Sequence, residues 1–253
     1  MTKEKPSLEM TGRKVLVVAE LGINHGGSYK RAELMVAQAA RAGADVVKFQ
    51  HYRPDEILGP KSPFLAEAKA CQLTRQEHGL LKAHAEYMGL EWGVSLFHPE
   101  DVEWTEGLGM LKYKVASRAA TNTDLLREIN KTRKPVLVST GLLPTPRDIE
   151  AVLEELGDCI VTLLYCVCDY PTPIERVDLA KLGKLSSYAR RIGFSSHCPS
   201  SIPTICAVAK GAHVTENHVT CSRDLAGCDM ASSLTFEEFG DMVKMIRTIE
   251  RMP

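Results

Sequence analysis

Runs of apolar, mostly β-branched residues recur at fairly even intervals along the chain, and each is short enough to form one strand. Several are almost continuously hydrophobic, which is typical of parallel strands covered on both faces, because antiparallel strands with one wet face more often alternate. The predicted strands are residues 15–22, 45–52, 91–97, 111–117, 135–140, 159–167, 191–197 and 213–220.

Helical patterns separate these runs. Stripes of apolar residues with the i, i+3, i+4, i+7 spacing of one helix face run over residues 32–40, 149–156 and 239–249. Gly43 and Gly157 follow the first two stripes and predict where those helices stop. These stripes are interpreted as core-facing surfaces.

Eight strands alternating with eight helices predict an α/β fold of the (β/α)8 TIM-barrel type, as a single domain over residues 1–253 with a short N-terminal extension at 1–14. The competing fold is an open doubly wound sheet. That fold normally uses fewer strands, and "AELGINHGG" lacks the G-x-G-x-x-G spacing of a dinucleotide-binding loop. Residues 53–71 are predicted to be a barrel loop with a short helical insertion.

Charge and cysteine content narrow the functional classes. With 31 Lys plus Arg against 32 Asp plus Glu, the chain has no general attraction for nucleic acid or for an anionic membrane surface. No run approaches 18 apolar residues, and the N-terminus has no apolar core like that of a signal peptide. We therefore expect a cytoplasmic location, which agrees with eight cysteines in no C-x-x-C spacing, interpreted as reduced thiols.

Polar side chains stand at the carboxyl ends of the predicted strands, where the active site of a barrel forms. Lys48 in "VVKFQ" and Lys114 in "YKVAS" place ammonium groups inside apolar strands, and an unpaired buried charge is costly. For either lysine alone a structural ion pair is the simpler explanation. The two together, with serines beside them, favour a bound phosphate or carboxylate.

Two histidines predict a metal site. His197 and His218 end the seventh and eighth predicted strands, which are neighbours in a closed barrel, and Glu216 shares a face with His218. So sparse a ligand set leaves positions for water and substrate, and suits manganese, cobalt, iron(II) or magnesium better than a closed zinc site. Glu20 and Asn24, around the end of the first strand, are predicted to face the reactants.

Seven ordered motifs resemble those of the sialic acid synthases, also called N-acetylneuraminate synthases. They are "AELGINHGG", "AGADVVKFQ", "YKVAS", "KPVLVSTG", "YPTP", "GFSSH", and "ENH" followed by "RDLAGCDMASSLTFEEF". The resemblance runs through most of the chain. It implies a homodimeric enzyme that condenses phosphoenolpyruvate with an aldehyde acceptor, a sugar or amino sugar, to give a 2-keto-3-deoxy acid and phosphate.

The resemblance also assigns roles. The residues implied to hold phosphoenolpyruvate are Lys48, Lys114, Ser117, Ser139 and Ser195, with Ser95 in support. The residues implied to face the acceptor are Glu20, Gln50, Tyr170 and Asp229. His197 and His218 would hold Mn²⁺, with Mg²⁺ or Co²⁺ as alternatives, and Glu216 would be the acid/base group.

Some positions depart from the family pattern. Asp169 stands where relatives have asparagine, which puts an extra negative charge near the expected phosphoenolpyruvate site. The resemblance covers the barrel alone, without the antifreeze-like domain. In typical members that domain contributes an arginine that contacts the acceptor, so the resemblance does not identify the acceptor.

Two other functions are compatible with the same residues. One is a metal-free aldolase in which Lys114 forms a Schiff base. The other is a barrel without turnover that binds a phosphorylated metabolite or a partner protein.

Overall fold

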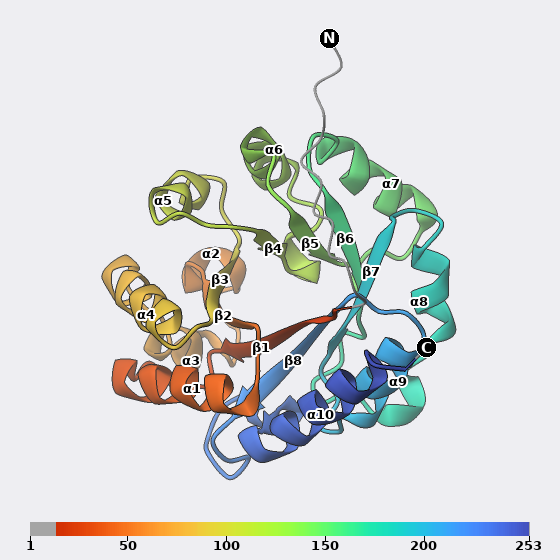
Figure 1. Ribbon diagram of the computed structural model, residues 1–253. Coiled ribbons are helices and arrows are strands. Elements are labelled where there is room, and N and C mark those ends of the chain that lie inside the picture. Colours follow the sequence, from red (N-terminus) through yellow and green to blue (C-terminus); the bar gives the residue numbers. More distant parts are fainter. Residues whose placement is uncertain (1–13, 253) are drawn as a thin grey trace.

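The computed structural model of the chain describes residues 14–252, so the extension expected at 1–14 lies almost wholly outside the described residues. Eight parallel strands form a closed barrel with helices around it (Figure 1). The barrel strands are β1 (Leu16–Gly22), β2 (Val46–His51), β3 (Glu91–Leu96), β4 (Tyr113–Val115), β5 (Val136–Ser139), β6 (Val161–Tyr165), β7 (Arg191–Ser196) and β8 (Val214–Thr220). Each strand pairs with the next along the chain, and β8 pairs with β1 to complete the ring. The predicted (β/α)8 fold is confirmed.

One helix of the outer ring follows each barrel strand. These helices are α1 (Tyr29–Ala42), α4 (Arg75–Tyr87), α5 (Asp101–Gly107), α6 (Thr123–Thr132), α7 (Pro146–Glu155), α8 (Ala180–Leu185), α9 (Ile202–Ala209) and α10 (Phe236–Ile249). The insertion expected after β2 consists of two short helices, α2 (Pro54–Ile57) and α3 (Leu65–Ala70). The remaining short elements are the 3-10 turns η1 (Ser117–Ala119), η2 (Ile174–Arg176) and η3 (Met230–Ser232), and β9 (Leu234–Thr235), which pairs with the end of β8.

Capping residues set the ends of the longest helices. The Ser28 side chain accepts a hydrogen bond from the backbone N–H of Arg31 at the start of α1, and Gly43 ends that helix with a φ of 87°. At the start of α10, Thr235 and Glu238 form a capping box. Both helices therefore begin where a capping side chain satisfies their free N–H groups, and Gly43 ends α1.

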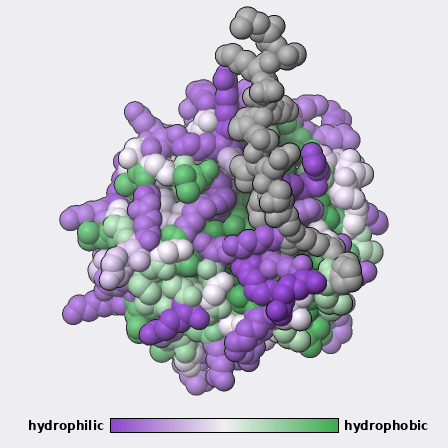
Figure 2. Space-filling view, in the orientation of Figure 1, coloured by the Kyte–Doolittle hydropathy of each residue, from purple (hydrophilic) through white to green (hydrophobic). Residues whose placement is uncertain are grey.

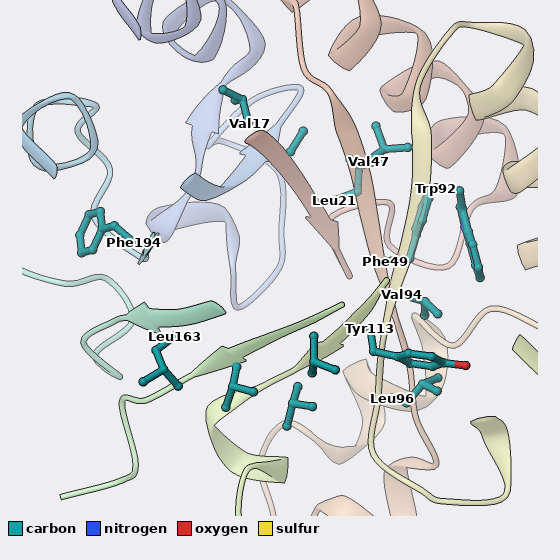
Figure 3. Packing of buried hydrophobic residues seen from close by; sticks show 14 of the residues in the cluster. Val17, Leu21, Val47, Phe49, Trp92, Val94, Leu96, Tyr113, Leu163 and Phe194 are labelled. Atoms are coloured by element: carbon teal, nitrogen blue, oxygen red, sulfur yellow. The ribbon is translucent and has the colours of Figure 1, made fainter. Parts of the chain in front are cut away.

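The strands bury two different faces. The outward face packs against the helices in one large apolar cluster that includes Val47, Trp92 and Tyr113 (Figure 3). The inward face holds a much smaller cluster, made of Val18, Val46, Leu137, Leu164 and Val214, with Leu16 packed against it. These residues come from five strands on different sides of the ring, so they fill the barrel interior. Polar side chains cover most of the visible molecular surface, with apolar side chains in separate patches (Figure 2).

The fourth strand is shorter than the sequence predicts. The apolar run at residues 111–117 predicts a full strand, but β4 keeps only Tyr113–Val115 because the 3-10 turn η1 begins at Ser117. In the described part of the chain, no helix is long and apolar enough to cross a membrane.

Candidate active site

On several strands, the inward-facing residue that follows the apolar cluster of the barrel interior is polar. Because side chains two apart on a strand share a face, Val18 is followed inward by Glu20, Val46 by Lys48, and Val214 by Glu216. The strand register then sets these residues side by side. Glu20 pairs in register with Lys48 on one side and with His218 on the other.

The same alignment continues around the ring. Ser95 of β3 lies in register with Lys114 of β4, and Ser195 of β7 with Glu216 of β8. The polar residues therefore form one layer at the carboxyl end of the barrel. This is the end at which (β/α)8 enzymes carry their active sites.

A cavity of about 640 Å³ opens at this layer. All but two of the site residues predicted from the sequence line it: Glu20, Lys48, Gln50, Ser95, Lys114, Ser117, Ser139, Tyr170, Ser195, His197, Glu216, His218 and Asp229. The two buried lysines and the two histidines thus share one cavity, which is the central expectation from the sequence.

Both lysines already have carboxylate partners. Nζ of Lys48 lies 2.5 Å from Oε2 of Glu20 and 3.7 Å from Oε2 of Glu216. Nζ of Lys114 lies 3.4 Å from Oε1 of Glu216. Lys48 also donates a hydrogen bond to Oγ of Ser95 at 2.9 Å. The ion pairs weighed for each lysine alone are therefore present, and they link both lysines into one buried network.

The two glutamates differ in the direction of their pKa shifts. Burial raises the pKa of Glu20, and its attraction to Lys48 only partly offsets that effect. Burial also acts to raise the pKa of Glu216, but Lys114, Lys48 and a hydrogen bond from Ser195 outweigh it and lower the pKa to about 2. The site thus shifts the pKa values of two buried carboxyl groups in opposite directions and favours the ionised form of Glu216.

The pKa values of the two lysines also shift in opposite directions. Burial lowers the pKa of Lys114, and attraction to Glu216 offsets this only in part. Burial acts in the same direction on Lys48, but Glu20 and Glu216 together outweigh it and raise the pKa of Lys48. Lys48 is therefore the more firmly charged of the two.

The histidine pair stands at one side of the cavity. The ring centroids of His197 and His218 are 5.3 Å apart. Nδ1 of His197 lies 2.7 Å from the backbone oxygen of Val167, so the proton sits on Nδ1 and leaves the Nε2 lone pair available. Burial lowers the pKa of His197 to about 3, which keeps the ring neutral. A neutral imidazole of this kind suits a divalent cation.

Other groups surround the histidine pair. The ring of Tyr170 stacks on that of His197 at 4.0 Å between centroids. Oδ2 of Asp229 lies 3.5 Å from Nδ1 of His218. Among the residues that the structure describes, no group of three or more His, Cys, Asp or Glu side chains forms a ready metal site. Any cation here would rely on the two imidazoles together with water or substrate oxygens.

Two predicted residues lie outside the cavity lining. Asp169 turns away and its Oδ2 pairs with a guanidinium nitrogen of Arg176 at 2.7 Å, which neutralises the extra charge expected near phosphoenolpyruvate. The buried amide of Asn24 donates to the backbone oxygen of Val219 and to Oγ of Ser233, both at 2.8 Å. Asn24 therefore ties the loop after β1 to the end of β8.

Several cavity residues were not predicted. Cys166 and Cys168 line the cavity beside Ser117, and their position follows from alternation after Leu164, whose side chain lies in the barrel interior. The other unpredicted residues that line the mouth come from loops whose path the local sequence does not define. They include Tyr52, Phe64, Glu67, Arg118, Leu142 and Cys228.

A closed (β/α)8 barrel with lysines, carboxylates and histidines gathered in one cavity defines an enzyme of the sialic acid synthase type. Residues 35–253 match the model of the NeuB family, and the chain belongs to that family. An uncharacterized protein from Methanocaldococcus jannaschii is 34% identical over 247 residues, covering 95% of this chain and 72% of that protein.

Named relatives agree with this assignment. The pseudaminic acid synthase of Campylobacter jejuni is 30% identical over 257 residues, covering 95% of this chain and 75% of that protein. The crystal structure of the N-acetylneuraminic acid synthetase from Leptospira borgpetersenii in complex with citrate superimposes with a TM-score of 0.90 at 28% identity, covering 94% of this chain and 84% of that one. The family resemblance seen in the sequence motifs is confirmed.

Proposed function

We propose that the protein joins phosphoenolpyruvate to the aldehyde carbon of a sugar, in the manner of the named synthases. C3 of phosphoenolpyruvate forms the new carbon–carbon bond, one water is consumed, and a 2-keto-3-deoxy acid and inorganic phosphate are released. The single observation that carries this proposal is the cavity that Lys48, Lys114, His197 and His218 share. By the same resemblance we expect a homodimer in the cytoplasm.

The lysines and serines supply the binding site for phosphoenolpyruvate. This ligand carries up to three negative charges. The two ammonium groups are nearly excluded from water, and an ammonium group attracts an anion more strongly in such an environment than in water. The raised pKa of Glu20 favours its uncharged form, which shifts the charge balance of this network toward the two lysines. The hydroxyl donors around it are Ser95, Ser117, Ser139 and Ser195.

The different pKa values of the two glutamates assign their roles. Glu20, whose pKa is raised, donates a proton to the acceptor oxygen as the new bond forms. Glu216, which is ionised, accepts a proton from the water that is consumed. Gln50 donates to Oε1 of Glu20 at 2.9 Å and orients that carboxyl group.

His197 and His218 would hold a divalent cation, which the family resemblance implies to be Mn²⁺, with Mg²⁺ or Co²⁺ as alternatives. Nδ1 of His218 makes no hydrogen bond and has Oδ2 of Asp229 3.5 Å away, and His197 presents a free Nε2, so the donor set fits such an ion. When bound, the ion polarises the acceptor carbonyl. Tyr170 covers the His197 ring and limits the access of water to it.

Calorimetric titration with phosphoenolpyruvate tests the proposal. We expect the wild type to bind, and Lys48→Ala and Lys114→Ala each to weaken binding by about tenfold or more. Lys210→Ala, at an exposed position after α9, is the matched control and should bind like the wild type. Incubation with phosphoenolpyruvate, Mn²⁺ and a panel of sugar aldehydes should then release phosphate. Failure of the wild type to bind phosphoenolpyruvate would overturn the proposal.

The lowered pKa of Lys114 supports a second candidate, a Schiff-base aldolase, because a buried amine that loses its proton is a nucleophile. Borohydride reduction in the presence of pyruvate separates the two functions. Covalent trapping on Lys114 would favour the aldolase. Binding of phosphoenolpyruvate without product from any acceptor would instead favour a barrel without turnover.

A further inference from the structure

Two cysteines stand in the cavity in a position that neither the family motifs nor the proposed chemistry uses. Leu164 of β6 points into the barrel interior, and Cys166 and Cys168 follow it at steps of two, so both thiols face the cavity. All eight cysteines are free in the structure, and these two are neighbours within one loop.

The absence of a side chain at Gly141 brings the two sulfurs together. A Cβ atom on Gly141 would lie 2.5 Å from Sγ of Cys168 and 2.6 Å from Sγ of Cys166, closer than real contacts allow. Both sulfurs therefore lie around the same small space. Oγ of Ser117 is 3.1 Å from Sγ of Cys166 and accepts a hydrogen bond from the backbone N–H of Gly141.

We propose that Cys166 and Cys168 form an oxidation site for hydroperoxides, and that the disulfide formed there weakens anion binding in the cavity. The second part of this inference rests on the proposed function. The pair differs from the other cysteines because it combines two adjacent thiols with a buried ammonium, that of Lys114, whose charge acts on both sulfurs.

The chemistry balances with the hydroperoxide as the oxidant. The Cys168 thiolate attacks one peroxide oxygen, the O–O bond breaks, and a sulfenic acid forms with release of water or an alcohol. The Cys166 thiol then displaces water from that sulfur as the S–S bond forms. Two thiols lose two electrons and two protons in total, and the peroxide is reduced.

The local environment supports this order of events. Cys168 is only half buried, and its hydrogen bond with Cys166 lowers its pKa, so it is the accessible nucleophile. The same hydrogen bond, together with burial, raises the pKa of Cys166, which suits a resolving thiol. A disulfide would remove the Cys166 thiol hydrogen beside Oγ of Ser117, 3.1 Å away, which is one of the hydroxyls expected to hold phosphoenolpyruvate.

Mass spectrometry tests the bond itself. The tryptic fragment 148–176 contains Cys159, Cys166 and Cys168 and no internal lysine or arginine. After treatment of the folded protein with hydrogen peroxide and alkylation, we expect this fragment to lose two hydrogens and to carry one alkyl group. The Cys159→Ser variant should still lose two hydrogens and carry no alkyl group, whereas Cys168→Ser should not form the link.

Calorimetry tests the consequence. In the wild type, peroxide should lower the affinity for phosphoenolpyruvate by about tenfold or more, and dithiothreitol should restore it. Cys206→Ser, at an exposed position on α9, should respond like the wild type, and Cys168→Ser should keep the affinity of its own untreated form.

Two results would overturn the inference: a wild-type fragment that stays unlinked under peroxide, or an equal loss of affinity in Cys168→Ser. A reduced wild type that fails to bind phosphoenolpyruvate would instead contradict the proposed function. The mass measurement still decides whether the disulfide forms.

Discussion

Glu20 and Glu216 are the same residue type in the same cavity, yet their pKa values move in opposite directions. Both are fully desolvated, so the difference arises from their partners. Glu216 lies between two ammonium groups and accepts a hydrogen bond from Ser195, whereas Glu20 has a single close lysine and is raised further by the charge of Glu216. A difference of one charged neighbour is thus enough to shift the pKa values of two buried carboxyl groups in opposite directions.

His78 provides a test of the same physics outside the active site. Its side chain on α4 is fully buried, and both ring nitrogens lack hydrogen-bond partners. Aromatic rings surround it, with those of His51, Trp92 and Trp104 between 5.3 and 5.9 Å away between centroids. Burial is the main cause that lowers its pKa from 6.5 to about 3.

This pKa predicts a pH-dependent stability. Below pH 6.5 the unfolded chain takes up a proton at His78 and the folded chain does not, so the contribution of His78 is complete above pH 6.5 and is lost as the pH falls toward 3. When the pH falls from 7 to 5.5, the free energy of unfolding of His78→Leu should therefore drop by about 1 kcal/mol less than that of the wild type. Urea unfolding at the two pH values measures this difference.

The control for this prediction lies on the same helix. His84 of α4 is only partly buried, and His84→Leu is measured alongside as the matched histidine replacement. Equal losses in the His78→Leu variant and in the wild type would show that His78 is protonated in the folded state.

At this scale the sequence predicts which residue types enter the cavity better than it predicts their partners. Lys48 and Lys114 are identifiable because a charge inside an apolar run requires compensation. The failure of Asp169 to line the cavity is not visible in the sequence, since it depends on Arg176 in a later turn reaching back to pair with it. Cys166 and Cys168 were missed because cysteine also serves as an ordinary core residue.

Among the secondary-structure elements, β7 shows how closely the barrel interior is packed. A Cβ atom on Gly193 would lie 2.5 Å from a methyl carbon of Leu164 and 2.5 Å from the backbone oxygen of Val214. Both neighbouring strands thus approach β7 at this point. Ser195 and His197, which follow on the same face, depend on this close approach for their positions.

Gly193→Ala should therefore destabilise the fold by about 1–3 kcal/mol, because the backbone oxygen of Val214 cannot move aside cheaply. The matched control is Gly183→Ala, in the exposed face of α8, where a Cβ atom meets nothing within 4 Å. That change should stabilise by about 0.5–1 kcal/mol. Urea unfolding compares the two variants, and equal effects would contradict the packing argument.

The elements themselves were largely predictable. Long apolar runs identify all eight barrel strands because parallel strands are buried on both faces. β4 is the exception in length, since pairing with β3 is limited to Ser95 and Lys114 and the chain then turns. The two helices α2 and α3 after β2 were expected as one insertion, because short helices without a continuous apolar stripe leave a weak pattern.

For the molecule as a whole, closure of the ring is what creates the active site. β1 and β8 are the first and last barrel strands, and their pairing places Glu20 beside His218. Local sequence patterns cannot predict this contact, because it forms only when the eight strands close into a barrel. Once closure is assumed, the meeting of His197 and His218 follows from the adjacency of β7 and β8.

A metal seated on β7 and β8 predicts a change in global stability that does not depend on turnover. An ion that binds only the folded barrel stabilises it by about 2.7 kcal/mol at a free concentration 100 times its Kd. For a chain of this length that corresponds to a rise in Tm of about 5–10 °C.

After dialysis against a chelator, addition of Mn²⁺ should therefore raise the Tm measured by calorimetry. The double variant His197→Ala, His218→Ala should show no rise, and His84→Ala should respond like the wild type. A barrel whose Tm ignores the ion, or a double variant that still responds, would contradict a metal site at these two histidines, because binding and stabilisation are linked by mass action.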